Sequence, residues 1–319
     1  MNALLQCISH SPLMGQHDPA APVLLGVKTA ITEAQQHIQT FDPELIILIA
    51  PDHYNGFFYD VMPAFCIGTN AYAIGDYGTA QGALNVPTDL AQSAAQYVLD
   101  SGVDIAVSHK MRVDHGFAQP LDLLMGSLNT VPVIPVFINS VATPLPSFER
   151  ARCLGEALGR WARTLNQRVL IIGSGGLSHQ PPVPEIASAN DQVKDILMGR
   201  GRNLTDEERA FKTKRVIEAA RQFVNDPNTL RPLNTEWDHE FINLIAKADL
   251  ARLDHISNQE VSEQAGRSAH EVKTWVAAAA AAKTFGAYQE KSRFYCAIPE
   301  WIAGFGIFTA TSATTPTSN

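Results

Sequence analysis

The feature that most constrains the fold is a series of short apolar segments of strand length. The run ELIILIA at residues 44–50 lies between Pro43 and Pro51 and has no polar residue after its first. A continuous apolar run of this length is typical of a strand buried on both faces, as in the parallel sheets of α/β proteins. By the same criterion strands are predicted at residues 3–9, 44–50, 105–107, 131–138 and 168–172.

Segments with helical spacing of their apolar residues separate these runs. Helices are predicted over residues 21–40, 88–101 and 147–165, the first of them ending before Pro43. Strands that alternate with helices predict an α/β fold with a mostly parallel central sheet flanked by helices on both faces.

Two prolines interrupt the run VPVIPVFI at residues 131–138. Pro132 and Pro135 have no N–H to donate to a neighbouring strand, and proline within sheets is found mainly at edges and bulges. This strand is therefore expected near an edge of the sheet or at a bulge.

The composition and the residue pattern of the sequence change beyond residue 180. Residues 190–283 are mostly polar, and their apolar residues are spaced as in helices. This pattern predicts a helix-rich C-terminal elaboration of one domain rather than a second domain. The apolar segment IPEWIAGFGIF can return a strand or a loop to the core. We expect a single domain over residues 1–308 and a disordered tail over 309–319, which is rich in Thr and Ser.

Composition excludes several classes of function. The 24 Lys and Arg residues against 32 Asp and Glu give a net charge of −8, and no basic run could follow a nucleic-acid backbone. The 4 cysteines form no CxxC pair, so neither a zinc knot nor a disulfide framework is expected. The N-terminal segment lacks the positive charge of a secretion signal, and no apolar stretch has membrane-spanning length. We expect a soluble, cytoplasmic protein that binds neither nucleic acid nor membrane.

Three histidines follow predicted strands: His10, His53 and His179. In open α/β sheets ligands bind beyond the carboxyl ends of the strands, so these side chains are expected to share one cleft and could bind a metal ion. Any one of them alone could instead be a hydrogen-bonded loop or core histidine. Asp114 directly precedes His115, and an Asp–His pair at these positions remains an open alternative.

A metal held by two histidines needs a third ligand, and oxygen-activating Fe(II) sites use two histidines and one carboxylate. One candidate is the cluster Glu236, Asp238 and Glu240; another is Glu271. The spacing Ser268-x-x-Glu271 before an alanine-rich run also fits a helix capping box, and spacing alone favours that interpretation for Glu271.

The glycine-rich segment GSGGLS at residues 173–178 departs from two known motifs. Ser178 stands where the dinucleotide fingerprint GxGxxG requires glycine, and Ser174 lacks the spacing of a GxSxG hydrolase elbow. Nucleotide binding and serine hydrolysis are therefore not predicted. The glycines instead indicate a turn where backbone approaches another group closely.

Separate motifs in a fixed order give the chain a resemblance to a known family. They are HSP at 10–12, APDHYNGF at 50–57, VDHGF at 113–117, GSGGLSH at 173–179 and HEVKTW at 270–275. Together they resemble the class III extradiol ring-cleavage dioxygenases, over nearly the whole chain and with no departure at the histidine and glutamate positions of these motifs.

The resemblance implies a non-haem Fe(II) bound by His10, His53 and Glu271, with His179 as acid–base residue and His115 as a second active-site histidine. The carboxylates at 236–240 remain the alternative third ligand.

The branch of the family that it resembles most implies extradiol cleavage, by O2, of 3-(2,3-dihydroxyphenyl)propanoate and of 2,3-dihydroxycinnamate, in a homo-oligomeric enzyme. Another substituted catechol, a zinc-dependent hydrolase on the same fold and a metal-free binding protein are the alternatives. Arg112 is a weak candidate for the partner of the substrate's carboxylate.

Overall fold

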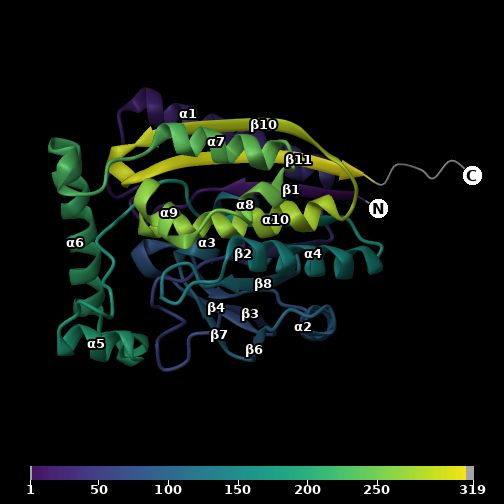
Figure 1. Ribbon diagram of the computed structural model, residues 1–319, viewed down its shortest axis with the longest axis horizontal. Helices are drawn as coiled ribbons and strands as arrows, with labels where there is room; N and C mark the ends of the chain where they lie inside the picture. The colour runs from purple at the N-terminus through teal and green to yellow at the C-terminus, as the bar shows by residue number, and fades with distance from the viewer. Residues whose placement is uncertain (1, 314–319) are drawn as a thin grey trace, which may run out of the picture.

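A computed structural model of the protein describes residues 2–313 and shows an α/β fold around one large sheet (Figure 1). The sheet has eight strands, in the spatial order β10 (Tyr288–Ile298), β11 (Ala303–Ala313), β1 (Asn2–Ile8), β9 (Val169–Ser174), β2 (Leu45–Ala50), β8 (Val133–Ile138), β3 (Phe65–Gly68) and β6 (Ala106–Ser108). A second sheet has three strands, in the order β5 (Gln81–Ala83), β4 (Ala71–Ile74) and β7 (Met111–Val113).

The centre of the large sheet is parallel. Strands β1, β9, β2 and β8 run in one direction as neighbours, whereas β11 pairs antiparallel with β1 and β3 pairs antiparallel with β8. The central strands β2, β8 and β9 are buried along their whole length. The predicted fold class, a mostly parallel central sheet, is therefore confirmed.

The α-helices are α1 (Ala21–Phe41), α2 (Thr88–Asp100), α3 (His115–Met125), α4 (Phe148–Thr164), α5 (Asp191–Leu197), α6 (Asp206–Asn225), α7 (Thr235–Ala246), α8 (Leu250–Leu253), α9 (Asn258–Gln264) and α10 (Lys273–Lys283). The 3-10 helices are η1 (Asp76–Gly78), η2 (Arg200–Asn203), η3 (Pro227–Thr229), η4 (Arg267–Val272) and η5 (Pro299–Trp301).

Helices cover both faces of the sheet because alternate strand residues point to opposite sides. Leu5 and Cys7 of β1 join the apolar core under α2, α4, α7 and α10, while Leu4 and Ile8 join the core under α1 and α3. Helices α5 and α6 stand at the left of Figure 1, at one end of these layers, and α6 packs against η5. No helix of the described residues is long and apolar enough to cross a membrane.

Close packing fixes the start of α10. A Cβ atom at Gly155 of α4 would lie 2.0 Å from the carbonyl oxygen of Ala277, so the two helices can approach this closely only with glycine there. The side chains from Thr274 to Ala282 in α10 are all buried against α4 and the sheet. The residues just before this helix, including Glu271, are thereby held at a fixed place beside β9.

The prediction of an edge or bulge for the strand 131–138 is wrong, because β8 lies inside the sheet between β2 and β3. The Val133 N–H points away from β2 and donates to Asn85. Residues two apart in a strand point the same way, so the Pro135 nitrogen also points away from β2, toward β3. The hydrogen-bonded pairing of β8 with β3 ends at Val136, next to this proline. The proline therefore interrupts no hydrogen bond with β2.

The predicted tail begins too early. Strand β11 continues to Ala313 and pairs with β1 from Ile307 to Ala313, and the Thr309 hydroxyl donates a hydrogen bond to Gln6 inside the sheet. Polar Thr and Ser side chains are compatible with this strand because their hydroxyls are satisfied there. Residues 314–319 lie outside the described residues.

Candidate active site

A cavity of about 490 Å³ lies beyond the carboxyl ends of β1, β9 and β2. His10 follows β1, His53 follows β2 and His179 follows β9, so neighbouring parallel strands deliver all three to one edge of the sheet. His115 comes from the first residue of α3, and Glu271 from η4. The residues singled out by the motifs all line this cavity.

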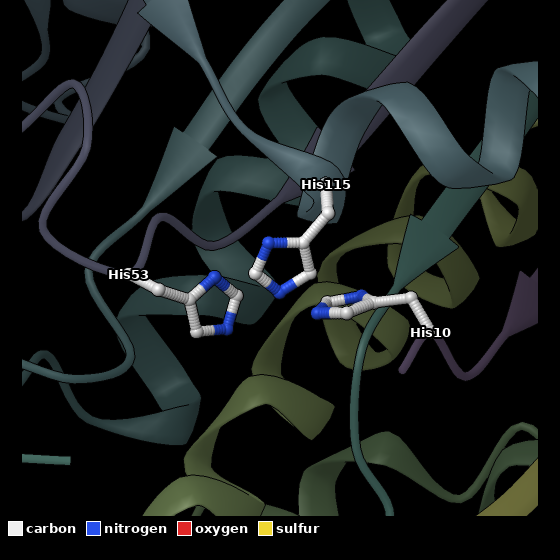
Figure 2. A group of neighbouring side chains, drawn as sticks. All are labelled: His10, His53 and His115. Carbon is white, nitrogen blue, oxygen red and sulfur yellow. The ribbon is translucent and has the colours of Figure 1, made fainter. Parts of the chain in front are cut away.

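The Glu271 carboxylate lies at the centre of the cluster. Its Oε1 is 3.0 Å from His53 Nε2 and 3.2 Å from His179 Nε2, and its Oε2 is 3.6 Å from His10 Nε2. Figure 2 shows the rings of His10, His53 and His115 facing one another. The His53 and His115 rings stack with centroids 4.4 Å apart, and ligand atoms of all three rings lie within 4.8 Å of one another.

The hydrogen bonds of Ser174 assign the tautomer of His10. The Ser174 hydroxyl donates its only hydrogen to the carbonyl of Gly116 at 2.7 Å, so it accepts from His10 Nδ1 at 2.9 Å. Burial lowers the pKa of His10 to about 3, so the ring is neutral near pH 7. His10 Nε2 therefore presents a lone pair to the cavity.

The other rings are fixed through Nδ1 in the same manner. His53 Nδ1 lies 3.0 Å from Asp114 Oδ2, His115 Nδ1 lies 2.6 Å from Asp76 Oδ2, and His179 Nδ1 donates to a backbone carbonyl at 2.9 Å. Carboxylate and carbonyl oxygens only accept, so each Nδ1 carries the hydrogen. Partners of this kind fix ring orientation in metal sites and make the ring a better ligand.

This donor set fits a metal ion. With Nδ1 hydrogens committed to their partners, His10 Nε2 presents a lone pair toward the Glu271 carboxylate, and His53 Nε2 does so when its ring is neutral. Electron pairs that face one another in a buried space need a cation between them. Two imidazole nitrogens and one carboxylate suit iron or zinc, and His10, His53 and His115 form an alternative three-histidine set.

The electrostatics of Glu271 also indicate a charged carboxylate. Burial by itself raises the pKa of Glu271, but the neighbouring His179 and His10 outweigh it and hold the pKa well below its usual range. The N–H of Gly176 donates to Oε2 at 3.0 Å. A Cβ atom at Gly175, where φ is +127°, would lie 2.7 Å from the Glu271 side chain. The glycine-rich turn therefore makes room for the carboxylate.

The pKa values of His53 and His179 lie above their usual range. Burial by itself lowers both, but Asp114 and Glu271 outweigh it at His53, and Glu271 with the Leu177 carbonyl outweighs it at His179. The site thus holds a group of negative charges that attracts cations, whether protons or a metal ion.

The local interpretation of Glu271 as a capping residue is wrong, because its side chain contacts the histidines and Gly176. Of the alternative carboxylates, Glu236 and Glu240 are exposed. Asp238 is buried but accepts hydrogen bonds of 2.7 Å from the hydroxyls of Ser178 and Tyr295 and from the Ser178 N–H. It holds the loop that carries His179.

The open alternative of a direct Asp114–His115 pair does not correspond to the structure. Asp114 binds the ring and backbone N–H of His53, and it also caps α3 through the Gly116 N–H. The partner of His115 is Asp76 of η1, for which the sequence offers no signal. Adjacent residues on an extended backbone point in different directions, which separates Asp114 from the ring that follows it.

The sequence also missed the wall that α5 and α6 add to the cavity. Phe211, Lys212 and Arg215 of α6 line it, together with residues of α5. Arg112, the weak candidate for a carboxylate partner, is not among the lining residues and donates instead to the Arg202 carbonyl at 2.9 Å.

Asp114→Asn is expected to weaken metal binding by about 10- to 100-fold, the usual effect of removing the carboxylate that orients a metal-binding histidine. Asparagine keeps the size of the side chain but removes the charge beside His53 Nδ1. The apparent dissociation constant for Fe(II), measured anaerobically by competition with a chelator, checks this. Asp122→Asn, an exposed position of α3, is the control; equal affinity in both variants would contradict the role of Asp114.

Comparisons with known proteins give consistent matches. The family described as the catalytic LigB subunit of aromatic ring-opening dioxygenase matches residues 4–306. A protein of Klebsiella pneumoniae named 2,3-dihydroxyphenylpropionate/2,3-dihydroxicinnamic acid 1,2-dioxygenase is 56% identical over 312 residues, 98% of this chain and 99% of that protein. A protein of Escherichia coli with the same name is 57% identical over 310 residues, 97% of this chain and 99% of that protein.

Among solved structures, an uncharacterized protein from Escherichia coli K12 aligns with 98% of this chain and 100% of its own at 11% identity. Its TM-score of 0.48 is too low to support a conclusion about fold or function.

Proposed function

Since the chain belongs to the family of the catalytic LigB subunit of aromatic ring-opening dioxygenase, we propose that it opens the ring of 3-(2,3-dihydroxyphenyl)propanoate by extradiol cleavage with O2. The product is 2-hydroxy-6-oxonona-2,4-diene-1,9-dioate, which contains both oxygen atoms of O2, and 2,3-dihydroxycinnamate is a second substrate. The observation that carries the proposal is the convergence of His10, His53, His115, His179 and Glu271 on one cavity. The names of relatives at 56% and 57% identity support the choice of substrate.

Fe(II) is the metal of this proposal, held by His10, His53 and Glu271. Neutral imidazoles and one carboxylate form the donor set of non-haem oxygenases and leave the metal with a net positive charge that favours a deprotonated catechol. When bound, Fe(II) supplies the electron transfer that allows O2 to react with the aromatic ring.

The remaining histidines move protons. His179 donates Nδ1–H to the Leu177 carbonyl, so in its neutral form Nε2 can accept the proton of a catechol hydroxyl. His115 is fixed by Asp76 at Nδ1, so its opposite nitrogen can carry a proton to an oxygen atom of the reacting group. We propose His179 as the base and His115 as the proton donor.

The cavity suits an aromatic substrate, because apolar side chains of Leu13, Phe211 and Trp301 line it beside the histidines.

The proposal also includes a single catalytic domain, a homo-oligomer and a place in the cytoplasm. Met198 is 52% exposed, an apolar surface that contact between subunits would cover.

Removal of the metal should abolish ring cleavage. Treatment with a chelator under argon is expected to reduce the rate below about 1% of the untreated enzyme, because an open metal position is needed for oxygen chemistry. Addition of Fe(II) should restore it, with one O2 consumed per catechol and a yellow ring-fission product.

Zinc loading separates the second candidate, a zinc hydrolase. Restoration of a hydrolytic activity by zinc, without O2 uptake and without a yellow product, would overturn the dioxygenase proposal. A chain that binds catechols but turns over none of them with Fe(II) would be a binding protein instead.

A further inference from the structure

One face of α6 points into the cavity and carries a lysine. Lys212 and Arg215 line the cavity one helical turn apart, with Glu208 one turn before them. Helix α6 packs against η5, which follows β10, so this face is held by the body of the protein. This face lines the same cavity as the histidines, and Lys212 contacts the main chain of His53.

The ammonium of Lys212 has one hydrogen-bond partner among residues 2–313. It donates to the main-chain carbonyl of His53 at 3.2 Å, and no carboxylate oxygen of the described chain lies within 4.0 Å of it. A lysine ammonium has three hydrogens to donate, so two remain without a partner. Burial lowers the pKa of Lys212, and the carboxylates of Asp76, Asp114 and Asp52, none of them in an ion pair with it, raise it in part.

The other cations at the cavity differ from Lys212 in pairing or in exposure. Arg200 pairs with Asp195 and Glu208, each at 2.9 Å, and these exposed pairs neutralise one another. Arg215 donates to the Pro182 carbonyl at 2.7 Å, where it is exposed to solvent. Among the described residues neither Lys212 nor Arg215 forms an ion pair, but Lys212 is half-buried whereas Arg215 is exposed, so Lys212 is the less solvated of the two.

We propose that Lys212 binds the carboxylate of the substrate's side chain and thereby selects catechols that carry a short acidic chain. This inference rests on the proposed function. Its geometric basis is the contact between Lys212 and the main chain of His53, whose ring belongs to the proposed metal site. A catechol of this class carries its side chain on the ring carbon next to a hydroxyl-bearing carbon, and both the histidines and Lys212 line the cavity.

The test compares substrates with and without the negative charge. In Lys212→Met the KM for 3-(2,3-dihydroxyphenyl)propanoate should rise about 10- to 100-fold, the effect of losing a hydrogen bond to a charged group. The KM for 3-propylcatechol, which has an uncharged chain, should change less than about 3-fold. Lys212→Arg keeps the charge and should retain most of the affinity. Lys214→Met, an exposed lysine of the same helix, is the control.

A second measurement does not require turnover. 3-Phenylpropanoate has the acidic chain but no hydroxyl groups, and calorimetry on the iron-loaded enzyme should show weaker binding by a similar factor in Lys212→Met but not in Lys214→Met. If Lys212→Met does not fold, Lys212→Gln serves for both measurements.

Each outcome decides the inference. Equal losses on 3-(2,3-dihydroxyphenyl)propanoate and 3-propylcatechol would mean that Lys212 only supports the His53 loop. Loss of selectivity in Arg215→Met with none in Lys212→Met would assign the role to Arg215. If the wild-type enzyme cleaves no catechol, the proposed function fails, whereas weaker 3-phenylpropanoate binding in Lys212→Met would still support the carboxylate site.

Discussion

Glu271→Gln should lower the affinity for Fe(II) by more than about 100-fold, since Glu271 is proposed as a direct ligand, and loss of a ligand costs at least as much as loss of a group that orients one. Glutamine keeps the size of the side chain and an oxygen that can accept from the Gly176 N–H. It removes the negative charge that faces the Nε2 atoms of His10 and His53. Ring cleavage should fall below about 1% of the wild-type rate.

Anaerobic reconstitution with Fe(II), desalting and measurement of the bound iron check this expectation. Glu240→Gln is the matched control, because Glu240 is exposed and belongs to the alternative carboxylate cluster. One tightly bound iron per chain in Glu271→Gln, together with iron loss in His115→Gln, would assign the metal to the three-histidine set instead.

His179→Gln and His115→Gln should each lower kcat by about 10²- to 10⁴-fold while iron remains bound, the usual contribution of a positioned acid or base. Glutamine can hydrogen-bond but cannot take up or release a proton near pH 7. The rate of yellow product formation and the iron content measure the two effects separately. His255→Gln, an exposed histidine, is the control.

The two roles can be distinguished by the acidity of the substrate. A catechol with an electron-withdrawing substituent loses its proton more readily, so it should recover more of the rate in His179→Gln than in His115→Gln. The reverse result would exchange the two roles. Normal kcat in both variants would remove both residues from the proton transfers.

Much of the fold could be predicted from local patterns. The apolar run at 44–50 and the prolines around it predicted β2, and helical spacing predicted α1, α2 and α4 close to their observed bounds. These patterns can be recognised locally, because the spacing of apolar residues within one strand or helix shows which of its faces is buried. The short β3, β4, β5 and β7 were not predicted, since strands of three or four residues carry few periods, although the equally short β6 was predicted at 105–107.

The family indicated by the motifs is confirmed by the comparisons, and the structure brings the predicted site residues to one cavity. Their roles remain predictions. Local reasoning on Glu271 favoured a helix cap, because a glutamate three residues after a serine has the same spacing in both cases. Only the docking of α10 against α4 and β9 directs this side chain to histidines that lie far away in sequence.

By itself the sequence determined the α/β architecture and the histidines that leave the carboxyl ends of β1, β2 and β9. The tertiary structure alone decided the partners: Asp114 for His53, Asp76 for His115, and the main-chain carbonyl of His53 for Lys212. The physical reason is that periodicity and burial are properties of one segment. The hydrogen bonds and uncompensated charges of a site depend instead on which distant segments pack together and exclude water between them.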